Sequence, residues 1–369
     1  MIYLDYTATT PIDQEVLDTY TRVEKDFFAN VSSMHKLGQR SNYLFEKAKS
    51  EIKDMLNLKQ HYLIFTGSAS EANNLAILGI VRKYPQGKII TTKIEHSSVY
   101  AVYQQLESEG YTVKYLDVDT KGIINLQQLA SYLDNDTVLV SIMWVNNIIG
   151  SIQPIDKVIE IIKNYPKVKL HVDGVQGLCK ILPDFNFEKI DLLTFSAHKI
   201  YGPKGIGLLA FKENIELKKI TYGSTVQYNI RPGTVDLAAV AALCKAIKKY
   251  YPQTKKHYLI VKQLNNYLRK KLQRISGIII NSSPDASPYV FNISIPGHNG
   301  ETIVHFLGNN NIYVSAGSAC SSKLKRSDRI VLNVSKSEDF ATSSIRISLS
   351  HLTTYQEIDK LIEILLQVN

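Results

Sequence analysis

The sequence predicts an α/β fold in which helices flank an open, mostly parallel central sheet. From residue 62 onward, short runs that are apolar throughout alternate with amphipathic segments such as residues 70–81. Fully apolar runs are typical of strands buried on both faces, as parallel strands joined by crossover helices are. After about residue 245 the pattern changes to a long charged helix followed by strands and helices, which indicates a smaller α+β unit.

The predicted elements follow one another in a regular order. Strands of the large sheet are expected at residues 62–66, 88–92, 113–118, 137–145, 168–173, 191–196 and 205–211. The later part is expected to contain a helix at 254–273, strands at 277–281 and 289–295, a helix at 301–308 and a strand at 344–350. Thr354 and Glu357 form a capping-box pattern at the start of a last helix. We therefore expect a large domain over residues 15–245 and a small domain formed by residues 1–14 and 246–369.

Composition and charge exclude several classes of protein. No apolar run is long enough to span a membrane, and the first residues lack the basic segment of a signal peptide, so a cytoplasmic protein is expected. The 3 cysteines are too few and too scattered for a disulfide framework or a zinc site, and no metal site is expected. The formal net charge is +9. Basic runs usually face solvent, so direct binding to nucleic acid is not expected.

Ligands of parallel α/β sheets bind at the carboxyl ends of the strands, and the residues that follow each run are therefore the candidate site. After the first run, Ala69 and Ser70 lie where a helix is expected to begin near Glu71. The free N–H groups of a helix N-terminus can bind a phosphate. Ser70 is an equally good candidate for a helix N-cap, so this signal is weak alone.

Two later strand ends carry groups that suit one cofactor. Asp173 follows one strand, with Gln176 shortly after it, and the next strand ends in Ser196, His198 and Lys199. A desolvated lysine becomes a nucleophile that can form a Schiff base with an aldehyde. Considered without the other residues, an aspartate at the position of Asp173 is more often a helix N-cap than a ligand-binding group. An imine-forming lysine, an acid for a pyridine nitrogen and a phosphate-binding helix end together indicate pyridoxal 5'-phosphate.

His96 follows a further strand and can stack on a flat ring, although a lone histidine is more often structural. With these residues in place, the sequence resembles the NifS/IscS-type cysteine desulfurases, class V members of the fold-type I pyridoxal-phosphate transferases. The stretches that carry the resemblance occur in the family's order and span nearly the whole chain: IYLDYTATTP, NVSSMHKLGQRS, FTGSASEANNLAI, EHSSVY, VNNIIGSIQPI, HVDGVQ, FSAHKIYGPKGIG, RPGT, VSAGSAC and SSIRISLSHLTT.

The resemblance implies a role for each matching residue. Lys199 would bind the cofactor covalently and then act as the base, and Asp173 would pair with the ring nitrogen. His96 would stack on the ring, while Asn147 and Gln176 would bond the ring oxygen. The substrate carboxylate would be bound by Arg346, which alternates with isoleucines in a predicted strand. The phosphate would be held by Ala69, Ser70, Ser196, His198 and Thr234 of a second subunit, which implies a homodimer.

Cys320 distinguishes the implied reaction from others of this fold. It lies in the small-residue run SAGSACSSK, which is typical of a loop, whereas Cys244 lies in an apolar helical pattern. Cys320 aligns with the family's persulfide cysteine. The resemblance implies that its thiolate takes sulfur from L-cysteine, that alanine is released, and that the sulfur passes to an acceptor protein of iron–sulfur cluster assembly or tRNA thiolation.

The chain also departs from the family pattern, and two alternatives stay open. Residues 222–234 lack the usual glycine-rich start, FTGSAS transposes the usual Ser-Gly, and Ile148 follows Asn147 where glutamate is usual. One alternative is another pyridoxal-phosphate enzyme, an aminotransferase or a selenocysteine lyase, which would not require Cys320. The other is a non-catalytic scaffold, associated with RNA through the basic charge.

Overall fold

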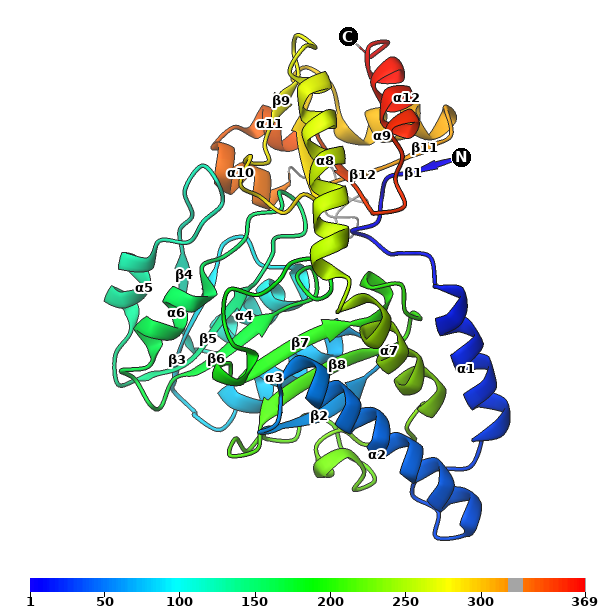
Figure 1. Ribbon diagram of the computed structural model, residues 1–369. Coiled ribbons are helices and arrows are strands. Elements are labelled where there is room, and N and C mark those ends of the chain that lie inside the picture. Colours follow the sequence, from blue (N-terminus) through cyan, green and yellow to red (C-terminus); the bar gives the residue numbers. More distant parts are fainter. Residues whose placement is uncertain (318–327, 369) are drawn as a thin grey trace.

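A computed structural model of the protein describes residues 1–317 and 328–368. Its centre is a seven-stranded sheet with the order β2-β8-β7-β6-β5-β3-β4 (Figure 1). The strands are β2 His61–Thr66, β3 Lys88–Thr92, β4 Thr112–Leu116, β5 Thr137–Met143, β6 Lys169–Asp173, β7 Leu192–Ser196 and β8 Gly207–Lys212. β8 runs antiparallel to β2 and β7, and the other neighbours are parallel. The predicted α/β fold with a mostly parallel sheet is confirmed.

Helices cover both faces of this sheet because its strands are apolar on both sides. On one face Leu63 and Phe65 pack with helices α1 Gln14–Asp26, α2 Lys36–Leu56, α6 Ile155–Ile162 and α7 Leu237–Tyr250. On the other face Ile64 packs with α3 Ala69–Val81 and α4 Ser97–Ser108. The short helix α5 Leu126–Tyr132 and the 3-10 turns η1 Phe187–Lys189, η2 Ala197–Lys199 and η3 Gln227–Asn229 complete this layer structure.

A second core forms around a four-stranded antiparallel sheet with the order β12-β13-β10-β9. Its strands are β9 Ile279–Ile280, β10 Val290–Ser294, β12 Ser315–Ala316 and β13 Ser344–Ser348. Helices α8 Thr254–Leu272, α9 Gly300–Asn309 and α12 Tyr355–Leu365 contribute apolar side chains to the same core. In Figure 1, α8 stands upright above the large sheet, among the other elements of this second core, and both termini lie in the upper part of the view.

The remaining elements connect the two sheets. β1 Ile2–Tyr3 pairs in parallel with β11 Ile312–Tyr313, and Asp5 forms a bridge to Ser348 of β13. The helices α10 Arg329–Ser335 and α11 Glu338–Thr342 share a small apolar cluster with Ile148. That position carries glutamate in the resembling family, so this chain replaces a charge by a buried contact.

The structure differs from the predicted elements in the direction, burial or length of three strands and in the start of one helix. β8 is antiparallel, β4 is a half-exposed edge strand rather than a buried one, and β9 is only 2 residues long. Helix α3 begins at Ala69, two residues before the expected start, because the Ser68 side chain accepts from the Glu71 N–H and caps it. The alternative reading of Ser70 as the N-cap is therefore wrong. The capping box of Thr354 and Glu357 is confirmed.

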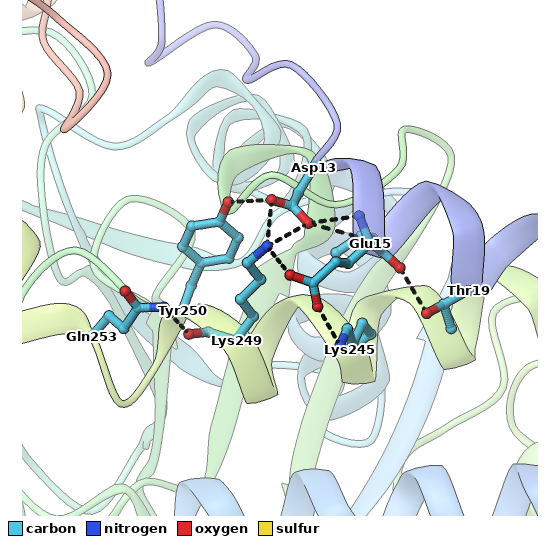
Figure 2. A network of polar contacts seen from close by, with 8 residues as sticks. Asp13, Glu15, Thr19, Lys245, Lys249, Tyr250 and Gln253 are labelled. Carbon is cyan, nitrogen blue, oxygen red and sulfur yellow. Dashed lines mark hydrogen bonds and ion pairs between the residues drawn. The ribbon is translucent and has the colours of Figure 1, made fainter.

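A polar network fixes the chain segment that leads from β1 to α1 (Figure 2). Asp13 caps α1 by accepting from the backbone of Glu15, and its other oxygen accepts from Lys249 Nζ at 2.9 Å and from the Tyr250 hydroxyl at 3.0 Å. Burial alone would raise the pKa of Asp13, but the hydrogen bonds from Lys249 and Tyr250 outweigh burial and hold this pKa below its usual range. The segment 5–12 is thus anchored after its last residue by the contacts of Asp13 with α7, and before its first residue by the pairing of β1 with β11.

We predict that Asp13→Ala lowers the free energy of unfolding by about 2 kcal/mol, because it removes a helix cap and an ion pair together. Asp13→Asn should cost less, since an amide oxygen still caps. The folded-state pKa of Asp13 is depressed, so its charge stabilises the fold above the unfolded-state pKa of about 3.9 and this contribution is lost as the pH falls below it.

Urea unfolding at pH 7 and pH 3.5 measures both effects. The control is Asp18→Ala on the exposed side of the same helix, which should change stability by less than about 0.5 kcal/mol. Equal losses for Asp13→Ala and Asp18→Ala would show that the network does not stabilise the helix junction.

Candidate active site

One cavity of about 260 Å³ lies at the carboxyl ends of β6 and β7, next to the first turns of α3 and α4. Ten of the predicted site residues line it: Ala69, Ser70, His96, Asn147, Asp173, Gln176, Ser196, His198, Lys199 and Arg346. A larger hollow of about 730 Å³ lies at the opposite end of these strands, beside Lys169 and Lys212, and none of the predicted residues lines it. The chemistry-bearing residues therefore gather in the smaller cavity.

The N-terminus of α3 forms one wall of the cavity through Ser68, Ala69 and Ser70. β8 approaches this turn so closely that a Cβ on Gly207 would lie 2.4 Å from the backbone carbon of Ser68, so only glycine fits there. The hydroxyl of Ser196, at the end of β7, lies on the same cavity. Backbone N–H groups, a hydroxyl and the helix dipole together suit an anion.

Thr234 does not line this cavity. It is exposed and lines a separate hollow with Gly67 and Arg231. The segment that departs from the family pattern is nevertheless attached here, since Arg231 pairs with Glu71 at 2.9 Å. The Gln227 side chain accepts from the N–H of Phe65 at 2.7 Å and donates to its carbonyl at 3.0 Å, which satisfies backbone groups of edge strand β2.

Asp173 is held by a chain of polar contacts that the sequence alone did not reveal. Its Oδ2 accepts from Asn73 Nδ2 at 2.9 Å, and the same nitrogen donates to the Ser98 hydroxyl at 2.8 Å. Ser98 in turn contacts His96 Nδ1 at 2.8 Å. Asn73 is fully buried on α3, so its polarity within an apolar helix was the available signal. Asp173 closes a strand and caps no helix.

The two site histidines are neutral near pH 7. Burial lowers the pKa of His96, and Lys199 reinforces this shift while Asp173 opposes it. Because His96 Nδ1 accepts from the N–H of Ser98, the proton of the neutral ring is on Nε2. Burial and the nearby Lys199 lower the pKa of His198 to about 4. Both rings therefore add no positive charge to the cavity.

Lys199 and the N-terminal segment meet at the cavity. The Lys199 amine donates to the backbone carbonyls of Thr7 at 2.7 Å and Ala8 at 2.6 Å. Gln176 Nε2 also donates to the Thr7 carbonyl, at 3.1 Å. On its other side Gln176 accepts from Lys180, which is a buried lysine that our sequence reasoning missed. The sequence feature that could have identified Lys180 is its position within the apolar run LCKIL.

Arg346 lies in β13 between two core isoleucines, so its side chain points away from that core and into the cavity wall. It is 3% exposed. Its NH2 group donates to Asp5 at 2.9 Å and its NH1 group to the carbonyl of Asn147 at 3.1 Å. Arg346 Nε and Asn147 Oδ1 are buried, and neither has a hydrogen-bond partner within the residues that the structure describes.

Cys320 lies outside the described residues, and the other two cysteines are buried. Burial raises the pKa of the Cys179 thiol. Burial, together with Glu51, raises the pKa of Cys244 to about 12. Only a thiolate is an effective nucleophile, so neither of these two cysteines is activated.

Within residues 1–317 and 328–368, no cluster of three or more His, Cys, Asp or Glu side chains could hold a metal ion. Over the same ranges no helix has the length and apolar character needed to cross a membrane.

We predict that Cys179 and Cys244 resist alkylation in the native protein. Their raised pKa and burial should slow labelling with iodoacetamide at pH 8 by about 100-fold or more relative to the urea-unfolded chain. Mass spectrometry of the digested protein after a short pulse measures each site separately. Rapid native labelling of either residue would contradict the burial seen here.

Comparison with known proteins places this geometry in a family. The family profile described as aminotransferase class-V matches residues 2–361. A NifS/IcsS protein homolog of Lactobacillus delbrueckii subsp. bulgaricus is 39% identical over 372 residues, which covers 98% of this chain and 95% of the relative. A cysteine desulfurase IscS of Vibrio vulnificus is 36% identical over 370 residues, which covers 98% of this chain and 91% of the relative.

Solved structures with the same fold include proteins similar to these relatives. A NifS-like protein superposes with a TM-score of 0.92 at 28% identity and covers 100% of this chain and 98% of its own. A structure described as SspA in complex with cysteine has a TM-score of 0.83 at 30% identity and covers 96% of this chain and 100% of its own.

Proposed function

This chain belongs to the aminotransferase class-V family, and we propose that it is a pyridoxal-phosphate-dependent cysteine desulfurase, which converts L-cysteine to L-alanine and transfers the sulfur. The observation that carries the proposal is the gathering of Lys199, Asp173 and Arg346 with a helix N-terminus around one cavity. Relatives named as cysteine desulfurases and a similar structure described as a complex with cysteine support the same substrate.

The cavity fits pyridoxal phosphate through the groups that it offers. Asn147 Oδ1 is buried without a partner among the described residues, as expected where a ligand completes the contacts. The α3 N-terminus and Ser196 suit the phosphate, and the Asp173 carboxylate suits a protonated ring nitrogen. When bound, the cofactor supplies an electrophilic aldehyde and a ring that withdraws electrons from the substrate's Cα.

Lys199 has two tasks in this proposal. Its amine anchors the cofactor and, once substrate replaces it there, takes the proton from the substrate's Cα. The carbonyls of Thr7 and Ala8 hold the amine at the cavity wall, which limits the positions it can adopt. Asp173, fixed by Asn73, keeps the ring nitrogen protonated by its negative charge. His96, neutral and at the start of α4, lies where it can cover the ring.

Arg346 binds the substrate carboxylate. Two of its nitrogens already contact Asp5, Ser315 and the Asn147 carbonyl, and these contacts hold the guanidinium in place. Its Nε, buried and unpartnered among the described residues, and the second N–H of NH1 are the donors that these contacts leave for the carboxylate. A planar guanidinium with a fixed orientation selects an α-amino acid over an amine that lacks the carboxylate.

Cys320 is the sulfur acceptor within the protein. Its thiolate attacks the substrate sulfur, so that a sulfur–sulfur bond forms while the carbon–sulfur bond breaks, and the electron pair left on carbon is protonated to give alanine. The raised pKa of both described cysteines supports the assignment to the third. The persulfide passes to an acceptor protein of iron–sulfur assembly or tRNA thiolation in the cytoplasm, and Thr234 completes the phosphate site of the second subunit in a homodimer.

We predict that purified wild-type protein shows the visible absorption band of bound pyridoxal phosphate and releases alanine and sulfide from L-cysteine. Lys199→Ala should lose covalent cofactor and reduce turnover by about 1000-fold, since it removes both anchor and base. Cys320→Ser should keep the band and form no persulfide in a single turnover. Cys244→Ser is the matched control and should react like the wild type.

Each alternative has its own signature in that experiment. Cys320→Ser that releases sulfide at the wild-type rate in a single turnover would exclude the persulfide step and favour another pyridoxal-phosphate enzyme. Wild-type protein that cannot be loaded with the cofactor would favour a non-catalytic scaffold.

We predict that Arg346→Lys raises the KM for L-cysteine by about 10- to 100-fold, with a smaller effect on kcat, because the lysine lacks the fixed Nε donor. The check is the ratio of kcat/KM for L-cysteine to that for cysteamine, which has no carboxylate. This ratio should fall in the variant. Equal losses for both substrates would show that Arg346 does not bind the carboxylate.

A further inference from the structure

Lys180 carries a buried amine to which the proposed reaction assigns no role. It is 7% exposed, and its Nζ donates to Gln176 Oε1 at 2.7 Å. The charged or titratable groups that interact with it are Lys199, Arg346, Cys179 and His198, and none of them is a carboxylate. An amine buried without an anion is costly, so its retention in a fold requires a reason.

The turn after β6 forces Lys180 inward. Gly177 packs so tightly on the Trp144 ring that a Cβ there would lie 2.0 Å from a ring carbon, so the absence of a side chain lets the turn lie close against the sheet. Cys179 adopts the left-handed backbone region, with φ 59°, which is unfavourable for a side chain with a Cβ. The backbone at Gly177 and Cys179 thus brings the Lys180 amine to the Gln176 amide oxygen.

The partners of Gln176 determine which way its amide points. The Thr7 carbonyl can only accept a hydrogen bond, so Gln176 Nε2 faces it at 3.1 Å. The Lys180 amine donates, so Gln176 Oε1 faces Lys180. Gln176 lines the cavity, and its second N–H is left for a ligand there. Without Lys180, a buried amide oxygen would lose its donor and the side chain its fixed orientation.

We propose that Lys180 is a positioning residue that fixes Gln176 as a hydrogen-bond donor to the cofactor's ring oxygen and places a positive charge behind that donor. The inference rests on the proposed function, because it assigns the oxygen of bound pyridoxal phosphate to this end of the cavity. The combined effect stabilises negative charge on that oxygen and lowers the pH at which the cofactor linked to Lys199 loses its proton.

The protonation state of Lys180 responds to what the cavity holds. Burial, followed by repulsion from Lys199 and Arg346, lowers the pKa of Lys180 to about 7. An anionic ligand in the cavity opposes this shift and favours the protonated amine. The charge is therefore present when an anionic cofactor is bound.

The test is a pH titration of the visible absorption band of the cofactor-loaded protein. Lys180→Met should move the titration midpoint upward by about one pH unit, because both the donor geometry and the charge are lost. Lys59→Met, at an exposed position outside the cavity, is the control for net charge and should leave the midpoint unchanged.

A double-mutant cycle tests the route through Gln176. In a Gln176→Met background, the additional shift caused by Lys180→Met should fall below about half of its value in the wild type. An equal shift in both backgrounds would overturn the positioning role and leave a through-space charge only. No shift in the wild-type background would overturn the proposal altogether.

Urea unfolding of the cofactor-free protein tests whether Lys180 is needed for the stability of the fold. Cofactor-free Lys180→Met should unfold in urea close to the wild-type concentration, because removing the buried amine relieves a desolvation cost that offsets the lost donor to Gln176 Oε1. If that variant does not fold, Lys180→Gln, which keeps a donor without the charge, should give a smaller upward shift, and a zero shift would overturn the proposal. Wild-type protein that binds no cofactor would instead overturn the proposed function.

Discussion

The carbonyl oxygen of Thr7 accepts hydrogen bonds from both Lys199 and Gln176, and the arrangement of the site depends on this contact. The carbonyl belongs to a segment without regular structure, which stays in place because its two ends are fixed. β1 pairs with β11 on one side, and Asp13 is bound to α7 on the other. Thr9 and Thr10 also contact His198, so these contacts and the Asp13 network together hold the carbonyl that orients the amine and the amide.

The charges around the cavity explain what it can bind. Lys199 and the helix N-terminus favour an anion, while the buried histidines stay neutral and add no charge. The charge of Arg346 is largely compensated by Asp5, which allows the guanidinium to be buried beside the cavity. Asp173 is the negative group that lines the cavity, and it lies where a cationic ring nitrogen is expected. The cavity is therefore suited to a ligand with anionic ends and a cationic centre.

Much of the fold and of the candidate site could be predicted because both follow from strand patterns. The apolar runs of β6 and β7 end at Asp173 and Ser196, Lys199 follows in the next turn, and the structure places all three at the cavity. Asn73 and Lys180 were missed because each lies in an apolar run and acquires a function only through a partner distant in sequence or in a compact turn. The antiparallel direction of β8 was missed because apolar patterning carries no information on strand direction.

The sequence by itself determined the order of strands and helices, the residues at the strand ends and, through its ordered motifs, the family. Those features depend on local pattern and spacing, which a linear chain displays. Only the tertiary structure decided that Thr7 and Ala8 meet Lys199, that Asp5 compensates Arg346, and that Lys180 stands behind Gln176. The first three contacts join residues nearly 200 or more positions apart and depend on how the two sheets and the N-terminal segment pack, which no local pattern encodes. The last contact lies within one turn, whose path depends on the close packing of Gly177 on Trp144.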